Sequence, residues 1–395
     1  MPNIKTLENI DLKNKRALVR VDFDLPLDDK GNITDDFRLK ECLPTIKYLI
    51  SQKCSIVLIS HLNRPKGKRI KKYSLKPITK KLEKLLRQDI IFYDKTISEV
   101  AINLSRKMRP GSIMLLENLR FNPGEEKNLP EFSRKLSEFG DIFINEAFAV
   151  SHREHASIVG IPEYLPSFLG FRFRKEVKEL DKILYNPERP LVAIIGGAKI
   201  STKIKVINKF LKIADKVLMG GALANTVFAG QGFNMGSSII DKGAFTEVEK
   251  IIPKKRINPK LFLPIDLGIW DGKIARYDEV NGVKEGEKAL DCGPKTINLF
   301  SRIIEEAKTI VWNGPLGLTE QKPFEKASGA MVEVIRKSSA YSVVGGGDTV
   351  GFIRKIKKEK AFNHLSTGGG AMLDYLANET LPGLEAIGKC QKFGN

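Results

Sequence analysis

The segments YSVVGGGDTVGF (341–352) and HLSTGGGAML (364–373) are the most informative part of the sequence for predicting the fold. In each, a short apolar run ends in three consecutive glycines, and a helix-like pattern follows. Glycine allows a positive φ and lets a ligand approach the backbone closely. Glycines at the start of a helix also leave N–H groups aimed at one point, which suits a phosphate group. One triplet is equally compatible with a tight turn, but two in the same strand-to-helix context favour a phosphate site.

Short apolar runs of this kind alternate with amphipathic stretches along the whole chain. Besides the two above, they are ALVRVDF (17–23), SIVLIS (55–60), SIMLLEN (112–118), DIFINEAF (141–148), LVAIIGGAK (191–199), KVLMGGA (216–222), LFLPID (261–266) and TIVWNGP (309–315). Nearly continuous apolar runs are typical of strands buried on both faces, and their alternation with helices is typical of parallel sheets. We therefore predict an α/β fold of two Rossmann-like, doubly wound lobes with parallel central sheets.

The length of 395 residues favours two domains. The stretch FRFRKEVKELDKIL (171–184) predicts an amphipathic helix, and the following YNPERP should end it. We place an N-terminal lobe over 1–170, an interdomain helix and hinge over 171–188, and a C-terminal lobe over 189–381.

Composition narrows the class of protein. The chain is 42% hydrophobic and 29% charged, as in ordinary globular proteins. No apolar run approaches the roughly 20 residues that span a membrane. The N-terminal MPNIKTLENIDLKNK lacks the apolar core of a signal peptide, so a cytoplasmic protein is expected. The cysteines are scattered without a CxxC pair, which predicts neither a zinc site nor a disulfide framework.

The net charge of +19 raises the alternative of a nucleic-acid-binding protein. Much of the excess lies in the basic clusters KGKRIKK (66–72), KPITKKLEKLL (76–86), KKRINPK (254–260) and RKIKKEK (354–360). Because these clusters lack interleaved aromatic residues, we interpret them as solvated faces and expect no nucleic-acid partner.

Charged side chains follow the predicted strands of the first half. These residues are Asp22, Asp24, His61, Arg64, Arg120 and Arg153, and a turn could carry Arg38 to the same edge. The carboxyl ends of parallel strands meet at one edge of a sheet, where ligands bind. Guanidinium groups bind phosphate and carboxylate bidentately. The pattern predicts a small ligand that carries phosphate and carboxylate.

In the second half the strands end in glycine instead. After the first of these strands, Lys199 and Lys203 are expected one helical turn apart on one helix face, beside a transferring phosphoryl group. Asp348 could hold a magnesium ion that bridges phosphates, and Glu320 could bind ribose hydroxyls. Neither a GxxxxGK[ST] loop nor a GxGxxG fingerprint occurs.

Taken together, the chain resembles the phosphoglycerate kinase family over nearly its whole length. The motifs that carry the resemblance are RVDFDLPL (20–27), ITDDFRLKECLPTI (33–46), SHLNRPKG (60–67), LLENLRFNPGEEKN (115–128), FINEAFAVSHREHAS (143–157), GGAKISTKI (196–204), WNGPLG (312–317), VVGGGDTV (343–350), STGGGAMLDYL (366–376) and LPGLEAI (381–387). They are long, distinctive and in the family's order.

The resemblance implies reversible phosphoryl transfer between 1,3-bisphosphoglycerate with ADP and 3-phosphoglycerate with ATP, with Mg²⁺. It implies that phosphoglycerate binds the N-terminal lobe, that the nucleotide binds the C-terminal lobe, and that residues 382–395 return to the N-terminal lobe. It also implies in-line transfer in a cleft closed by hinge motion, in a monomer.

Residue roles carry over motif by motif. The resemblance assigns substrate binding to Asp22, Phe23, Asp24, Arg38, His61, Leu62, Asn63, Arg64, Arg120 and Arg153. It assigns nucleotide binding to Gly197, Lys199, Lys203, Glu320, Gly346, Gly347, Asp348 and Thr349, with Asp348 on the metal. It assigns catalysis to Arg38, Lys199, Gly346 and Gly369.

Some positions depart from the family's pattern. Asp24 stands where the family has asparagine, and a carboxylate repels an anion where an amide can donate to it. Asn63 replaces a glycine, which requires a positive φ that asparagine tolerates. Glu146 replaces an aspartate. Two alternatives stay open: a catalytically silent relative that binds polyanions, and a kinase for a different acyl phosphate.

Overall fold

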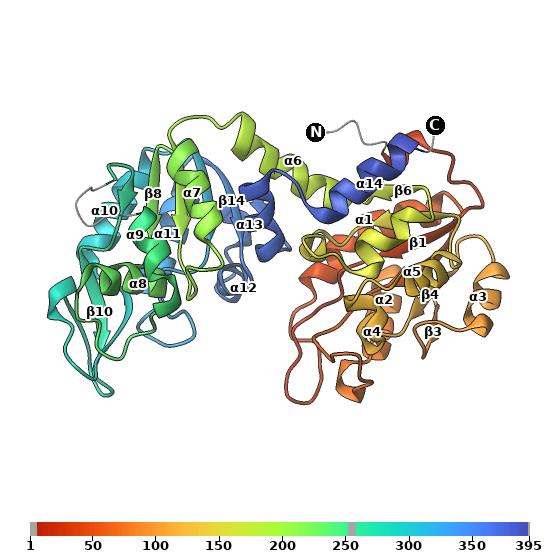
Figure 1. Cartoon of the computed structure of the whole chain (residues 1–395), viewed down its shortest axis with the longest axis horizontal. Coiled ribbons are helices and arrows are strands. Elements are labelled where there is room, and N and C mark those ends of the chain that lie inside the picture. Colours follow the sequence, from red (N-terminus) through yellow and green to blue (C-terminus); the bar gives the residue numbers. More distant parts are fainter. Residues whose placement is uncertain (1–5, 252–257, 394–395) are drawn as a thin grey trace. The chain divides into compact units, whose positions relative to one another are not determined.

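The computed structural model describes residues 6–251 and 258–393. Parts of the predicted basic cluster 254–260 and the outermost residues of the predicted first lobe lie outside these residues. The chain forms two compact units. The first comprises Met1–Lys178 with Thr380–Asn395, and the second comprises Glu179–Glu379 (Figure 1).

A six-stranded parallel sheet lies at the centre of the first unit, in the order β3-β4-β2-β1-β5-β6. Its strands are β1 (Arg16–Arg20), β2 (Ser55–Ile59), β3 (Ile90–Tyr93), β4 (Ile113–Leu116), β5 (Ile142–Asn145) and β6 (Ser167–Leu169). All the predicted strands of the first half are confirmed. The outer strands β3 and β6 were not predicted, because their runs are short.

Alternate residues of each strand enter two separate cores, one on each face of the sheet. In β1, Ala17 and Val19 belong to one core and Leu18 to the other. Since side chains alternate along a strand, an unbroken apolar run fills both cores at once. The strand sequences therefore require helices on both faces.

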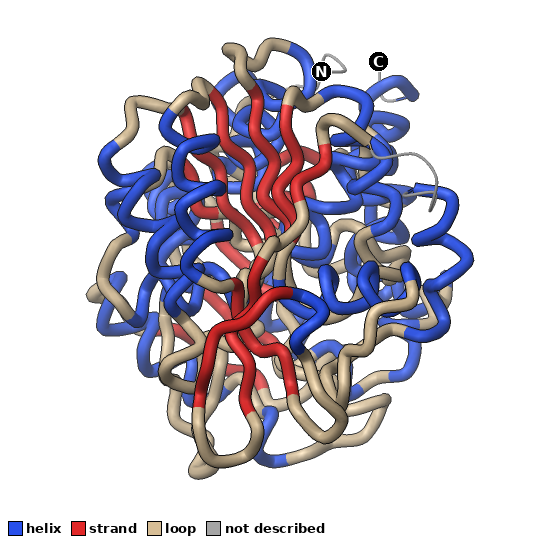
Figure 2. The backbone as a smooth tube through the Cα atoms, turned by 90° about the vertical axis from the view of Figure 1, so that its left-hand side faces the viewer, coloured by secondary structure: helices blue, strands red, loops and turns tan. Residues whose placement is uncertain are grey.

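Helices meet that requirement. They are α1 (Phe37–Ser51), α2 (Lys76–Leu86), α3 (Glu99–Arg106), α4 (Pro123–Glu126) and α5 (Pro130–Ser137). Ile46 of α1 and Leu82 of α2 enter one core, whereas Ile102 of α3 and Leu136 of α5 enter the other. In the second unit, which faces the viewer in Figure 2, helices likewise lie along both sides of the strands.

The second unit also contains a six-stranded parallel sheet, in the order β15-β14-β13-β7-β8-β9. Its strands are β7 (Leu191–Ile195), β8 (Lys216–Met219), β9 (Leu261–Phe262), β13 (Thr309–Asn313), β14 (Tyr341–Gly345) and β15 (His364–Leu365). Its helices are α7 (Ile204–Ile213), α8 (Gly221–Gln231), α9 (Phe245–Ile251), α10 (Pro294–Glu305), α11 (Lys326–Lys337), α12 (Gly347–Lys355) and α13 (Gly369–Asn378). The predicted α/β fold with two parallel sheets is confirmed.

A three-stranded antiparallel sheet in the second unit was not predicted. It consists of β10 (Asp266–Trp270), β11 (Ala275–Glu279) and β12 (Lys288–Cys292), with β10 in the middle. The run 261–266 had been predicted as one strand, but β9 ends at Phe262 and β10 begins at Asp266. Pro264 lies between them and has no N–H to donate to a ladder.

The predicted helix over 171–184 is confirmed as α6 (Phe171–Tyr185). In the first unit, the carboxylate of Glu146 accepts the Arg172 N–H from 3.1 Å, near the start of α6. In the second unit, Tyr375 donates to Asp181 at 2.6 Å. The final helix, α14 (Pro382–Phe393), belongs to the first unit. Within residues 6–251 and 258–393, no helix has the length and apolar character to span a membrane.

Candidate functional site

The first group of predicted residues follows β1 and β2, which are parallel neighbours. Asp22 and Phe23 come after β1 and are buried, as are His61 and Leu62 after β2. The Phe23 N–H donates to Ser60 Oγ at 2.9 Å, which joins the two strand ends. The carboxyl edge of the sheet thus brings these segments together.

Asp24 lies at the centre of this group. Its carboxylate accepts the Asn63 N–H at 2.8 Å, and its Oδ2 lies 3.5 Å from His61 Nε2. The Arg38 guanidinium donates to the Asp24 carbonyl at 2.9 Å and lies 3.3 Å from the Asp22 carboxylate. Asn63 has a φ of +59°, so the positive φ required at this position is confirmed.

Arg120 joins the same group through a hydrogen bond of 2.8 Å to the Asn63 carbonyl. Arg153 is half-buried, and its charge lowers the pKa of Arg120 and of His155, so it belongs to the same neighbourhood. Arg64 is exposed, and its backbone N–H is held by the Asn63 side chain at 2.9 Å.

Arg20 is a member that the sequence analysis missed. It is fully buried at the end of β1, with Nη2 at 3.1 Å from His61 Nδ1 and Nε donating to Ser157 Oγ at 2.8 Å. A guanidinium only donates, so His61 Nδ1 must accept, and neutral His61 carries its proton on Nε2, toward Asp24. An arginine inside an apolar strand was the available sequence signal.

Glu125 supports this arrangement from behind. Its carboxylate accepts the Ser157 hydroxyl at 2.6 Å and the Ser157 N–H at 3.0 Å. Ser157 in turn accepts from Arg20. The buried charge of Arg20 is therefore oriented through Ser157 by a buried carboxylate.

We call this group the cationic cluster; its members are Arg20, Arg38, His61, Arg120, Arg153 and His155. Burial, together with the charge of Arg20, lowers the pKa of His61 to about 4. Burial and the neighbouring arginines lower the pKa of His155 to about 3, and its Nδ1 has no hydrogen-bond partner. Burial also lowers the pKa of Arg120 to about 10. Glu126 pairs with Arg120 at 3.3 Å, yet Arg20 and Arg153 still lower the pKa of Arg120 and of His155, so neighbouring cationic side chains repel one another here, and an anionic ligand would relieve that repulsion.

Asp24 is ionised within this cluster. Burial opposes its charge, but the hydrogen bond from His61, the Asn63 N–H and the charge of Arg38 together lower its pKa below the usual value. The cluster therefore presents one carboxylate at the position that the resemblance assigns to an amide.

The second group of predicted residues lies at the carboxyl edge of the sheet in the second unit. Gly197 follows β7 and Gly346 follows β14, with φ of +96° and +104°. The Gly314 N–H, after β13, donates to Thr349 Oγ1 at 2.9 Å. Gly347 and Asp348 form the exposed first turn of α12, so the predicted helix start after the first glycine triplet is confirmed.

The two glycine triplets contact each other. A Cβ on Gly369 would lie 2.5 Å from the Gly346 Cα, so only glycine fits there. The contact follows from the pairing of β14 with β15, which places both strand ends side by side. The backbone N–H groups of α12 and α13 thus begin at neighbouring points.

The expectation for Lys199 and Lys203 was wrong in its geometry. Turns occupy the segment up to Lys203, and α7 begins only at Ile204, so the two lysines share no helix face. Lys199 is exposed, whereas the buried Lys203 ammonium donates to the carbonyls of Gly196 and Asn313. Burial lowers the pKa of Lys203 to about 8, although the charge of Asp348 opposes the shift.

Glu320 is exposed on the loop between β13 and α11. Among the described residues, no group of three or more His, Cys, Asp or Glu side chains could hold a metal ion. Asp348 therefore offers a single carboxylate, which fits a magnesium ion held mainly by nucleotide phosphates and water.

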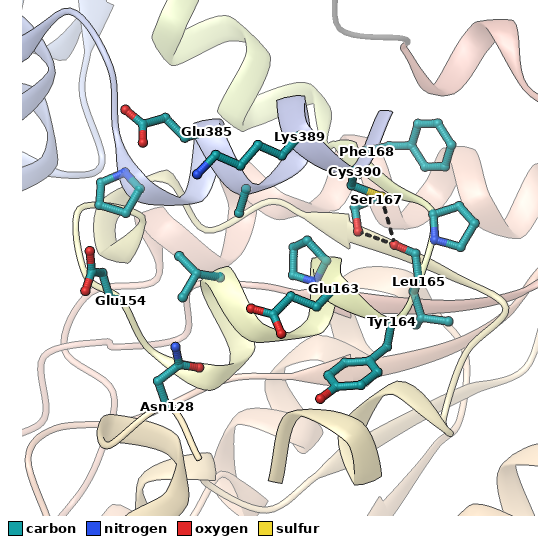
Figure 3. A pocket seen from close by; sticks show the side chains of 15 residues that line it. Asn128, Glu154, Glu163, Tyr164, Leu165, Ser167, Phe168, Glu385, Lys389 and Cys390 are labelled. Carbon is teal, nitrogen blue, oxygen red and sulfur yellow. Dashed lines mark hydrogen bonds between the residues drawn. The ribbon is translucent and has the colours of Figure 1, made fainter. Parts of the chain in front are cut away.

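A cavity of about 730 Å³ lies elsewhere in the first unit, beside α14 (Figure 3). Side chains of Glu163, Tyr164, Glu385 and Lys389 line it, and the Cys390 thiol donates to the Leu165 carbonyl at 3.2 Å. None of its lining residues is a predicted site residue.

A family model described as phosphoglycerate kinase matches residues 7–379. The chain belongs to the phosphoglycerate kinase family. The phosphoglycerate kinase of Pseudothermotoga lettingae is 41% identical over 98% of this chain and 99% of its own length. That of Borrelia garinii subsp. bavariensis is 42% identical over 98% of this chain and 100% of its own.

Solved phosphoglycerate kinase structures agree with the fold. The structure from Coxiella burnetii has a TM-score of 0.84 and 34% identity, covering 98% of this chain and 99% of its own. The structure from Pyrococcus horikoshii OT3 has a TM-score of 0.87 and 30% identity over the same shares. The predicted family and fold are therefore confirmed, and the roles of individual residues stay predictions.

Proposed function

We propose that the chain transfers a phosphoryl group reversibly between ATP and 3-phosphoglycerate, forming ADP and 1,3-bisphosphoglycerate. This is the glycolytic reaction of the phosphoglycerate kinase family, a carboxyl-accepting phosphotransferase (EC 2.7.2.3). The observation that carries the proposal is the cationic cluster, in which several arginines lie close enough to lower the pKa of neighbouring cationic groups and could bind a ligand with both phosphate and carboxylate.

In the first unit, 3-phosphoglycerate would bind the cationic cluster. The proposed contacts are Asp22, Phe23, Asp24, Arg38, His61, Leu62, Asn63, Arg64, Arg120 and Arg153. Arginine supplies paired N–H donors that match carboxylate and phosphate oxygens. His61, neutral with its proton on Nε2, would act as a hydrogen-bond donor, and its position is supported by Arg20.

In the second unit, the nucleotide would bind along the carboxyl edge of the sheet. The proposed contacts are Gly197, Lys199, Lys203, Glu320, Gly346, Gly347, Asp348 and Thr349. The Lys203 ammonium is hydrogen-bonded to two backbone carbonyls, and it would turn from them toward a phosphate of the bound nucleotide. Mg²⁺ would arrive with the nucleotide as part of the substrate, and Asp348 would support it.

The chemistry needs no protein nucleophile. A carboxylate oxygen of 3-phosphoglycerate attacks the γ-phosphorus in line, and the bond from that phosphorus to the β–γ bridging oxygen breaks. Arg38, Lys199 and the backbone N–H groups near Gly346 and Gly369 would neutralise the charge on the transferring group. The two ligands must meet for this transfer, and the two-domain fold is consistent with hinge closure.

A coupled assay of ADP release tests the proposal. Release should require Mg²⁺ and 3-phosphoglycerate, and acetate or 2-phosphoglycerate should not replace the latter. Arg38→Ala should reduce kcat by about 10²–10³-fold, by analogy with the loss of one transition-state donor. Arg69→Ala is the matched control, since Arg69 is exposed and paired with Asp94 at 3.7 Å, outside the cluster.

Two outcomes would overturn the proposal. Activity with a different carboxylate, and none with 3-phosphoglycerate, would support another acyl-phosphate kinase. Steeply salt-dependent nucleic-acid binding without phosphoryl transfer would support a silent, polyanion-binding relative. We further propose a monomer that works in the cytoplasm with small-molecule ligands only, and size-exclusion chromatography checks the monomer.

A further inference from the structure

Asp291 is a buried carboxylate in β12 that none of the proposed roles uses. It is 5% exposed. Its Oδ2 accepts the Ala327 N–H at 3.1 Å, in the first turn of α11, and the Lys326 N–H adds to this bonding. The first N–H groups of a helix have no partner within it and carry partial positive charge. Asp291, a residue of the strand β12, therefore caps the N-terminus of α11.

The same carboxylate also touches the start of the loop that precedes α11. At Gly317, the space where a Cβ would stand is taken by Asp291 Oδ1 and by the Phe324 carbonyl. The next residue, Leu318, donates its N–H to the Leu290 carbonyl of β12 at 2.8 Å. Both ends of the loop thus meet on β12, at or beside Asp291.

That loop, residues 314–325, carries Glu320. Two further contacts hold the loop. The Leu316 N–H donates to Ser328 Oγ at 3.0 Å, and the Phe324 ring packs against Trp270 with the ring centroids 5.9 Å apart. Glu320 itself is exposed, so its position depends on how the loop is anchored.

We propose that Asp291 is a positioning residue for the nucleotide: by joining both ends of the loop 314–325, it places Glu320 against the ribose. The proposal rests on the nucleotide-binding role of Glu320 in the proposed function. It adds a residue that touches neither substrate and acts through the backbone of the loop.

The charge state of Asp291 should matter to this role. Burial raises its pKa to about 7, with a further contribution from the nearby carboxylate of Glu325, against the backbone N–H groups that favour ionisation. The other groups facing it are the buried Cys292 thiol and Lys326, whose ammonium lies 5.4 Å from the ring centre of Tyr277. Above this pKa the carboxylate is ionised and accepts the N–H groups of Ala327, Lys326 and, at 2.9 Å, Cys292; below it, one acceptor becomes a donor.

The first test compares Asp291→Asn with Asp266→Asn. Asp266 is a matched control because it is also buried in the small sheet and caps a different helix, α10, through the N–H groups of Lys295 at 2.9 Å and Thr296 at 2.7 Å. The amide in Asp291→Asn keeps the shape but turns one acceptor into a donor. Equilibrium binding of MgADP is measured by calorimetry, with unfolding temperature, kcat and KM for both substrates.

We expect Asp291→Asn to raise the Kd of MgADP about tenfold at pH 8, in line with the loss of one charge-assisted hydrogen bond. The KM for 3-phosphoglycerate and the kcat at saturating nucleotide should stay within twofold of wild type. Asp266→Asn should lower the unfolding temperature and leave the Kd of MgADP unchanged. Equal effects of the two variants on this Kd, or none from Asp291→Asn, would overturn the proposal.

Glu325→Gln is a milder variant, should Asp291→Asn fail to fold. It removes the neighbouring negative charge, so the pH at which wild-type MgADP binding weakens should shift downward. The nucleotide itself is protonated equally in both experiments, so a difference between the pH profiles of variant and wild type reports on the protein alone. An unshifted pH profile would overturn the proposal. MgADP binding is measured without catalysis, so a chain that bound MgADP but transferred no phosphoryl group would refute the proposed function and still decide the role of Asp291.

Discussion

Replacing Asp24 by asparagine should tighten the binding of 3-phosphoglycerate, because it removes the negative charge that faces the proposed ligand. Asp24 Oδ2 lies 3.5 Å from His61 Nε2 and 4.0 Å from Arg38 Nη1, so it occupies donors that an anion would use. Asparagine has the same shape and can still accept the Asn63 N–H. The substitution therefore changes charge while keeping the local backbone contact.

The expected gain in binding free energy can be worked from the distance between Asp24 and an anion held by the same donors, which would be about 4 Å. Two unit charges about 4 Å apart repel by about 4 kcal/mol at an effective dielectric constant of about 20, and by about 1 kcal/mol in water. The Asp24 side chain is 36% exposed, so solvent screens much of its field. We therefore expect a gain near the lower limit, about 1–2 kcal/mol, which corresponds to roughly a 5- to 30-fold lower Kd.

Calorimetric titration with 3-phosphoglycerate at low salt measures this gain, and the gain should shrink as salt is added. Asp28→Asn is the control, because Asp28 is a carboxylate further along the same loop that is bonded to Asn32 and not to the cluster. Weaker binding by Asp24→Asn would refute the repulsion argument. It would show instead that the carboxylate orients His61 and Arg38 for the ligand.

Three further perturbations follow from the structure. Burial raises the pKa of Glu146 to about 8, against 4.5 in the unfolded chain, so the free energy of unfolding falls as pH rises from 4.5 through 8. Glu146→Gln should remove this loss, which we expect to be about 1–3 kcal/mol at pH 9, as measured by denaturant titration. Burial lowers the pKa of His155 to about 3, against 6.5 in the unfolded chain, so the free energy of unfolding falls as pH drops below 6.5. In His155→Gln, the unfolding temperature should therefore depend less on pH below 6.5 than in the wild type. A Cβ on Gly347 would meet no atom within 4 Å, so Gly347→Ala should keep the unfolding temperature while raising the KM for ATP several-fold; an unchanged KM would remove Gly347 from the nucleotide site.

The cationic cluster was largely predictable because it follows from topology. Parallel neighbours such as β1 and β2 end at the same edge, so residues far apart in sequence, such as Asp24 and Asn63, must come together there. Arg20 was missed because the prediction considered only residues beyond the strand ends. Its burial depends on Ser157 and Glu125, which come from remote segments, and periodicity cannot show such a pairing.

The second unit was predicted less completely, for physical reasons. The run before the second glycine triplet was correctly predicted as the strand β15, but its extent, only His364–Leu365, is set by pairing with β14. The antiparallel sheet contains the strand ARYDE (275–279), which is half-buried or exposed and shows no apolar run. Lys203 was assigned to a helix face, but burial against the carbonyls of Gly196 and Asn313 decides its direction.

The glycine triplets can now be divided between folding and ligand binding. A Cβ on Gly345 would overlap only the sulfur of the flexible Met372 side chain, whereas one on Gly369 would overlap the Gly346 backbone, so the packing of the second unit alone requires glycine at position 369. The same is not true of Gly347, which is exposed at the start of α12 with open space around it. Neither a positive φ nor a neighbouring atom requires glycine at this position. A ligand that approaches the N–H groups of α12 supplies a reason for glycine there, and the argument for a phosphate site therefore depends on Gly347 more than on the triplets as such.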